Sequence, residues 1–160
     1  MDFLSLNSNA FEGTIPSQIG LLTKLVSLWL SDTQLSGTVP EELYMWLSPL
    51  EWLDLSNSAL SGTISNNIGL LTNLGRLYLS GNKFHGTVPA TPESLEHLHV
   101  NGNDLTGTMP ESLCRNQFQK TASFVADCGS NNETGVPELL CDCCTECCDP
   151  ITGICIPSNQ

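Results

Sequence analysis

Residues 77–89 read LYLSGNKFHGTVP, and the pattern of leucine, asparagine, glycine and proline in this stretch recurs along residues 1–110. A Gly-Thr pair followed by an apolar residue begins at Gly13, Gly37, Gly62, Gly86 and Gly107, that is, at steps of 24, 25, 24 and 21 residues. Self-similarity at a period of roughly 20 to 50 residues is typical of a solenoid, in which each coil buries its apolar face against its neighbours. The spacing therefore predicts one elongated repeat domain.

The residue types within each repeat follow from the need to close one coil. Leucines of the L-x-L unit, such as Leu77 and Leu79, should point inward because strand residues alternate sides. An inward Asn can bond backbone groups where the strand ends. Asparagine stands there in the first, fourth and fifth coils (Asn9, Asn82, Asn103), and a hydroxyl residue replaces it in the second and third (Thr33, Ser58). We expect weaker but still local hydrogen bonding in those two coils.

The Gly-Thr segment predicts the second half of each coil. Glycine permits a backbone conformation closed to other residues, and Thr-Ile or Thr-Val after it favours a second short strand. Proline then follows at four of the repeats (Pro16, Pro40, Pro89, Pro110), with Ser65 in the third. Because proline is tolerated in a first helical turn, a short helical turn should begin there.

The consensus L-x-x-L-x-L-x-x-N-x-L-x-G-x-I-P resembles the plant-type leucine-rich repeat of receptor-kinase ectodomains and polygalacturonase-inhibiting proteins. The resemblance covers residues 1–110 and implies a right-handed β/3-10 or β/α horseshoe with parallel strands on its concave face. It also implies non-enzymatic recognition of peptides, proteins or glycans on that face. Two departures stand out. An extra residue within residues 43–49 predicts a longer convex helix, and the last coil is three residues short before Leu95.

Residues 111–160 should form a cysteine-rich C-terminal cap. All eight cysteines lie there: Cys114, Cys128, Cys141, Cys143, Cys144, Cys147, Cys148 and Cys155. An even count at one end favours disulfides, with Cys114 to Cys128 as our preferred bridge and the other pairings open. The alternative is a thiolate metal cluster at the Cys-x-x-Cys spacings, which we disfavour because the cysteines are crowded and no histidine is near.

Two further features of this tail concern the compartment. Asn132 begins a glycosylation sequon, which modestly supports secretion. The tail also resembles those of leucine-rich-repeat proteins from diatoms, through Ala126-Asp127-Cys128-Gly129 and the Cys-x-Cys-Cys-x-x-Cys-Cys run that starts at Cys141. That resemblance implies an extracellular location rather than a particular ligand.

Charge limits the partners. The 17 acidic and 5 basic residues give a formal net charge of −12, which repels nucleic acid and anionic membranes. Cationic partners or weakly bound calcium fit better, although acidity can simply keep a secreted protein soluble. No stretch approaches the roughly 18 apolar residues of a membrane span. The chain begins inside a strand without a signal peptide, so we expect the C-terminal part of a longer secreted or cell-surface protein, lacking its N-terminal cap and earlier repeats.

Strand alternation predicts which side chains face out of the sheet. Three columns result: Phe3, Ser27, Trp52, Arg76, His97; then Ser5, Trp29, Asp54, Tyr78, His99; then Asn7, Ser31, Ser56, Ser80, Asn101. Exposed aromatics beside charged groups are typical of a recognition hot spot. We therefore predict a ligand-binding face formed by Ser27, Trp29, Trp52, Asp54, Arg76, Tyr78, His97 and His99. The alternative is that these side chains only stabilise the sheet by stacking, and we interpret the two histidines as titratable rather than metal-binding.

No nucleophile motif and no phosphate-binding loop is present, so we expect neither an enzyme nor a cofactor. Three hypotheses about function follow. The first is an extracellular recognition module, and the second is a structural or adhesive matrix protein that associates with itself through calcium. The third is ice binding through one file of threonines (Thr14, Thr38, Thr63, Thr87, Thr108), because flat threonine arrays occur on some ice-binding solenoids.

Overall fold

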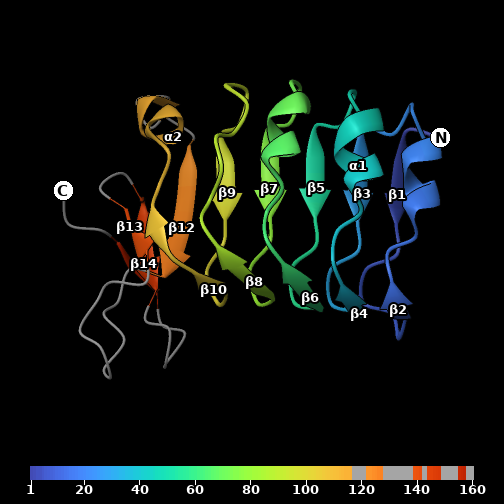
Figure 1. The fold of residues 1–160 in the computed structure, drawn as a ribbon, viewed down its shortest axis with the longest axis horizontal. Coiled ribbons are helices and arrows are strands. Elements are labelled where there is room, and N and C mark those ends of the chain that lie inside the picture. The colour runs from blue at the N-terminus through green and yellow to red at the C-terminus, as the bar shows by residue number, and fades with distance from the viewer. Residues whose placement is uncertain (117–121, 128–138, 142–143, 149–154, 158–160) are drawn as a thin grey trace.

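The computed structural model describes residues 1–116, 122–127, 139–141, 144–148 and 155–157. The chain winds into coils stacked along one axis, from the N-terminal end on the right of Figure 1 to the C-terminal end on the left. The fold is thus the predicted leucine-rich-repeat solenoid. Its core lies between a main sheet, a second sheet along one edge of the coils and a row of short helices.

The main sheet has eight strands in the order β1 (Phe3–Ser5), β3 (Ser27–Trp29), β5 (Trp52–Asp54), β7 (Arg76–Tyr78), β9 (His97–His99), β12 (Ser123–Asp127), β14 (Glu146–Cys148) and β15 (Cys155–Pro157). All neighbours pair in parallel except β14 and β15. A five-stranded sheet contains β10 (Asp104–Leu105), β8 (Lys83–Gly86), β6 (Ala59–Gly62), β4 (Gln34–Gly37) and β2 (Glu12–Thr14), and β11 (Gly107–Thr108) pairs with β13 (Leu139–Leu140). The second strand of each coil in the five-stranded sheet therefore ends no later than the threonine, earlier than the sequence predicted.

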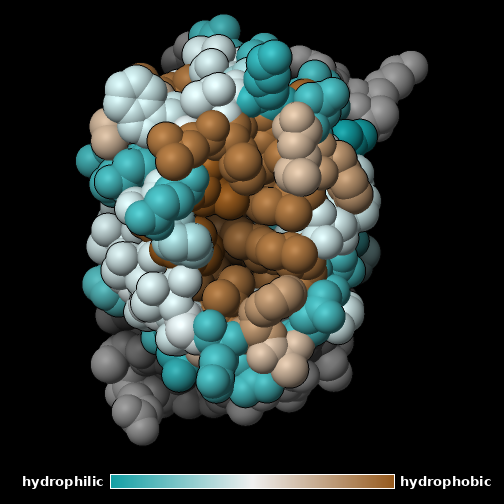
Figure 2. All heavy atoms as spheres, turned by 90° about the vertical axis from the view of Figure 1, so that its right-hand side faces the viewer, coloured by the Kyte–Doolittle hydropathy of each residue, from teal (hydrophilic) through white to brown (hydrophobic). Residues whose placement is uncertain are grey.

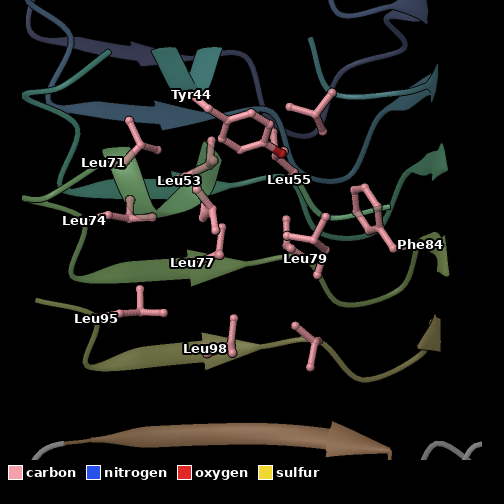
Figure 3. Packing of buried hydrophobic residues seen from close by; sticks show 14 of the residues in the cluster. Tyr44, Leu53, Leu55, Leu71, Leu74, Leu77, Leu79, Phe84, Leu95 and Leu98 are labelled. Carbon is pink, nitrogen blue, oxygen red and sulfur yellow. The ribbon is translucent and has the colours of Figure 1, made fainter. Parts of the chain in front are cut away.

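Leucines at equivalent positions form the core. Leu28, Leu53, Leu77 and Leu98 stand opposite one another in consecutive strands, and each is at most 1% exposed. Figure 3 shows that the second inward leucines of the strands and the leucines of the convex side pack onto this row. Phe84 fills the space beyond the strands. Burial of one such side chain stabilises the fold by about 1.5 to 3 kcal/mol, so the stack of coils is held mainly by contacts between neighbours.

The inward asparagines tie each coil to the one before it. Asn82 Nδ2 donates to the carbonyl of Leu79 in its own coil at 3.1 Å and to that of Leu55 in the previous coil at 2.7 Å. Its Oδ1 accepts the N–H of Leu60 at 3.0 Å. Asn103 repeats this arrangement one coil later. These bonds satisfy backbone groups that the strands leave unpaired, and they confirm the role predicted for asparagine.

Hydroxyl groups serve the second and third coils, as expected. Thr33 Oγ1 donates to the Leu30 carbonyl at 3.0 Å and lies 3.0 Å from Ser58 Oγ. At the other end of the solenoid the series continues with Asp127, whose Oδ2 accepts the N–H groups of Gly102 at 2.6 Å and Asn103 at 3.3 Å. A carboxylate can accept several donors but donates none, so Asp127 takes the accepting role of the asparagine Oδ1 but cannot donate to backbone carbonyls as Asn82 and Asn103 do.

The Gly-Thr pairs bring neighbouring coils into close contact. Gly37, Gly62, Gly86 and Gly107 have φ between 75° and 94°, in the region that favours glycine. A Cβ on any of them would lie only 2.8 to 3.2 Å from the γ-methyl group of the threonine in the preceding coil. Glycine is therefore required for its backbone conformation and for the close approach of the next coil.

The convex side carries the predicted short helices: η1 (Ser17–Leu21), α1 (Glu41–Trp46), η2 (Asn66–Leu70) and α2 (Glu111–Asn116). The coil with the extra residue forms the α-helix α1, whereas its neighbours form 3-10 turns, so the prediction of a longer helix is confirmed. The shortened coil has no helix between Pro89 and Leu95. It leaves a hollow of about 390 Å³ lined in part by Thr91, whose buried hydroxyl has no partner among the described residues.

The two ends of the solenoid differ. At the N-terminal end, shown in Figure 2, apolar side chains face solvent, including Met1, Phe11 and Leu21 at 73%, 46% and 77% exposure. Strands β1 and β2 are the unpaired edges of their sheets there. At the other end, β12 adds a further coil with Phe124 and Ala126 buried. Over the described part of the chain, no helix is both long and apolar enough to cross a membrane.

Four cysteines in the described part of the cap are disulfide-bonded. Cys141 and Cys144 are bonded, with their Cα atoms 5.5 Å apart, and Cys147 and Cys148 are also disulfide-bonded. A sulfur in a disulfide is not a thiolate ligand, so this bond supports the disulfide prediction over the metal alternative at the Cys141 to Cys144 spacing. The preferred Cys114 to Cys128 bridge and the sequon at Asn132 lie outside the described residues.

The close packing of the repeat glycines against threonine methyl groups predicts a specific loss of stability. Gly62→Ala should lower the free energy of unfolding by about 1 to 3 kcal/mol, because alanine is strained at φ 89° and its Cβ would lie 2.8 Å from the Thr38 methyl group. The matched control is Gly69→Ala, where a Cβ would meet only the Ala90 carbonyl at 3.7 Å. Urea denaturation measures both variants. Equal stability of the two variants would contradict the requirement for glycine at position 62.

Candidate functional site

The strand register brings the predicted outward residues together on one face of the main sheet. Trp52 pairs with Ser27 on one side and with Arg76 on the other, and Asp54 stands between Trp29 and Tyr78. His97 and His99 extend the two columns by one strand. Arg76 is exposed and the other seven predicted site residues are half-buried. The sequence thus placed all eight on the correct face.

Rings from five consecutive strands touch one another across this face. Centroid distances are 4.8 Å for Phe3 to Trp29, 4.9 Å for Trp29 to Trp52, 6.0 Å for Trp52 to Tyr78 and 4.7 Å for Tyr78 to His99, all with an edge-to-face geometry. We call these five residues the aromatic strip. Each such ring pair contributes about 0.5 to 1.5 kcal/mol beyond its buried area. The contacts therefore stabilise the sheet, and they also hold the rings in a fixed arrangement.

Two charged side chains, those of Arg76 and Asp54, lie beside the aromatic strip. The Arg76 guanidinium carbon is 5.0 Å from the Trp52 ring centroid, a cation–π distance. Asp54 Oδ1 accepts the N–H of Ser56 at 3.0 Å and its hydroxyl at 2.6 Å. Over the described residues, Asp54 Oδ2 has no hydrogen-bond partner and no cation lies within 4.0 Å of the carboxylate. One oriented carboxylate, with one oxygen unpaired among the described residues, thus lies beside the aromatic strip.

The indole N–H groups of Trp29 and Trp52 are buried without a hydrogen-bond partner in the described structure. Buried donors are usually paired, and leaving one unpaired costs about 1 to 3 kcal/mol. Both unpaired donors fall at the centre of the strip.

His99 and Tyr78 have altered ionisation. Burial, and next the neighbouring His97, lower the pKa of His99, whereas Glu146 and Asp54 act in the opposite direction. Its Nε2 lies 3.1 Å from Ser123 Oγ. Burial also raises the pKa of Tyr78, against the effect of Arg76. Across the described ranges, no three metal-ligating side chains converge.

Sequence reasoning missed the continuation of this face beyond β9. Ser123 and Val125 of β12 pair with His97 and His99, so the two columns continue by register into the cap, where Val125 is buried. The available signal was the alternation of Phe124 and Ala126, which are buried like the leucines of earlier strands. The five threonines of the predicted file are all exposed along the five-stranded sheet and β11.

Comparison with known proteins identifies the repeats. The family model described as Leucine Rich Repeat matches residues 24–46, 49–71, 73–95 and 94–116, and a search of curated protein sequences found no match. Among solved structures, the chain is similar to the ectodomain of the receptor kinase SOBIR1 from Arabidopsis thaliana, with 37% identity over 69% of this chain and 60% of that one and a TM-score of 0.66.

Two other solved structures are similar. The plant peptide hormone receptor RGFR1, in complex with RGF2, shares 37% identity over 72% of this chain and 19% of that one, with a TM-score of 0.66. A plant ice-binding protein shares 32% identity over 82% of this chain and 42% of that one, with a TM-score of 0.69. The chain therefore spans less than two thirds of the length of each of these proteins.

The position of His99 predicts a pH dependence of stability. Because folding lowers its pKa, the native state binds this proton more weakly than the unfolded chain, and stability should fall as the pH drops below about 6.5. His99→Gln should reduce that fall, as measured by the melting temperature at neutral and mildly acidic pH. His85→Gln, on the exposed side of β8, controls for the loss of one imidazole. The same pH dependence in wild type and His99→Gln would refute the assignment.

Proposed function

The chain belongs to the leucine-rich-repeat family, and on that basis we propose that it is a non-catalytic, extracellular recognition module that binds a peptide, protein or glycan through the aromatic strip. The observation that carries this proposal is the unbroken contact of Phe3, Trp29, Trp52, Tyr78 and His99 on one sheet face. The similarity to the SOBIR1 ectodomain and to a peptide hormone receptor in complex with its ligand supports it. We further propose that the protein is secreted or displayed at the cell surface.

The physical properties of the strip suit ligand binding. Tryptophan, tyrosine and arginine are the residues most often found at binding hot spots, and Trp29, Trp52, Tyr78 and Arg76 lie on three adjacent strands. Ring contacts already restrict these side chains, so a ligand would lose less conformational entropy in ordering them. The backbone beneath is satisfied by strand pairing, which leaves recognition to the side chains.

A test of this function uses paired tryptophan substitutions. Immobilised wild-type protein should capture a ligand from extracellular material of its source, and Trp29→Ala with Trp52→Ala should weaken that binding about thirtyfold or more, because even one hot-spot truncation costs about 2 kcal/mol. Trp46→Ala is the matched control, since Trp46 lies on α1 and is 58% exposed. Circular dichroism would verify that each variant is folded. Undiminished binding by the folded double variant would place the site elsewhere.

Ice binding is a second candidate, favoured by the exposed threonine file and by the similarity to a plant ice-binding protein. The packing of four threonine methyl groups onto the next glycine explains the file without this function. The hypothesis predicts thermal hysteresis that Thr38→Lys with Thr63→Lys abolishes, while Thr72→Lys, at an exposed threonine outside the file, leaves it intact. No hysteresis in the wild-type protein would eliminate the hypothesis.

A further inference from the structure

We propose that the group recognised at the centre of the aromatic strip is a cation, the guanidinium or ammonium of an Arg or Lys side chain in a peptide ligand, held by Asp54 between Trp29 and Tyr78. The inference rests on the proposed recognition function and names the ligand chemistry of the same face. It follows from the arrangement of one carboxylate and its neighbouring rings.

The first argument is geometric. Asp54 pairs with Trp29 in β3 and with Tyr78 in β7, so an aromatic side chain stands on each side of the carboxylate in the same outward column. Ser56 fixes the carboxylate through Oδ1 and leaves Oδ2 without a partner among the described residues. Aromatic faces attract cations through their quadrupole, and an ionised carboxylate accepts their N–H groups. The same position therefore offers a cation both kinds of interaction.

The second argument comes from the protein's own cation. The Arg76 guanidinium stacks on Trp52 at 5.0 Å, which shows that the rings of this strip can hold such a group. It makes no ion pair with Asp54, since no described cation lies within 4.0 Å of that carboxylate. Arg76 occupies the neighbouring outward column. The position over Asp54 therefore stays open to a cation from another molecule.

The third argument is electrostatic. Burial is the main cause of the pKa shifts of Tyr78 and His99, and Asp54 acts to raise both pKa values, so its negative field reaches Tyr78 on the next strand and His99 one strand further, even with Arg76 nearby. The net charge of −12 acts in the same direction at longer range, attracting cationic ligands and repelling anionic ones. An acidic group above Asp54 would meet repulsion from the carboxylate and from the protein as a whole.

Indole NMR signals provide the test. In isotope-labelled protein, the side-chain N–H resonances of Trp29, Trp52 and Trp46 are assigned by single Trp→Phe variants. Titration with the blocked tripeptide acetyl-Gly-Arg-Gly-amide should move the Trp29 and Trp52 resonances and leave that of Trp46, on the convex helix, in place. Acetyl-Gly-Glu-Gly-amide should move none of them. Because the interaction is electrostatic, added salt should weaken it.

The matched variants are Asp54→Asn and Asp104→Asn. Asp54→Asn keeps an oxygen for the Ser56 hydrogen bonds and removes the charge, and it should weaken Arg-peptide binding about two- to fivefold, the usual contribution of a solvent-accessible ion pair. Asp104→Asn removes an exposed acid in β10, on the other sheet, and should bind as wild type does. Equal binding by wild type and Asp54→Asn overturns the inference, as does an equal response to the Glu peptide.

The outcome separates this inference from the proposed function. If the Arg peptide moves no indole resonance while a captured ligand is still lost on Trp29→Ala with Trp52→Ala, the cation inference fails and the recognition function stands. If the captured ligand is retained by the tryptophan variant, the recognition function fails whatever the peptides do.

Discussion

The structure depends on the hydrogen bonds and close contacts that fix one coil on the next. Asn82 and Asn103 each bond backbone groups of their own coil and of the preceding one, and four of the five repeat glycines pack against the threonine methyl group of the preceding coil. A solenoid has contacts only between neighbours, so its stability is close to a sum of these interfaces. Any residue that sets the distance between two coils therefore sets the register of everything carried on them.

The aromatic strip is a consequence of that register. Trp29 and Trp52 are 23 residues apart in sequence, yet their ring centroids lie 4.9 Å apart because β3 and β5 are paired in parallel. A slip of one residue would move every outward ring to the core side of its strand. The buried leucines oppose such a slip, since Leu28 and Leu53 would then face solvent. Core packing thus positions the aromatic strip without contributing a residue to it.

The repeat made most of the fold and the site predictable. Strand alternation placed Trp52, Asp54 and Tyr78 outward because a parallel sheet of short strands leaves one geometry for each position. The second strand was misplaced because Thr-Val suggests a strand by propensity, whereas pairing in the structure ends at the glycine, where φ becomes positive. The added strand β12 was missed because Phe124 and Ala126 depart from the leucine pattern while occupying the same buried sites.

Ring contacts and side-chain orientations required the structure. No sequence pattern shows that Ser56 holds one oxygen of Asp54 and leaves the other free, because that depends on local side-chain geometry within β5 and the turn after it. Stability along the strip is also uneven. Phe3 belongs to an edge strand with one neighbour and is 50% exposed, whereas β5 is paired on both sides. Local stability follows the number of packed neighbours, so the strip should be least ordered at Phe3 and better ordered over β3, β5, β7 and β9, which are each paired on both sides.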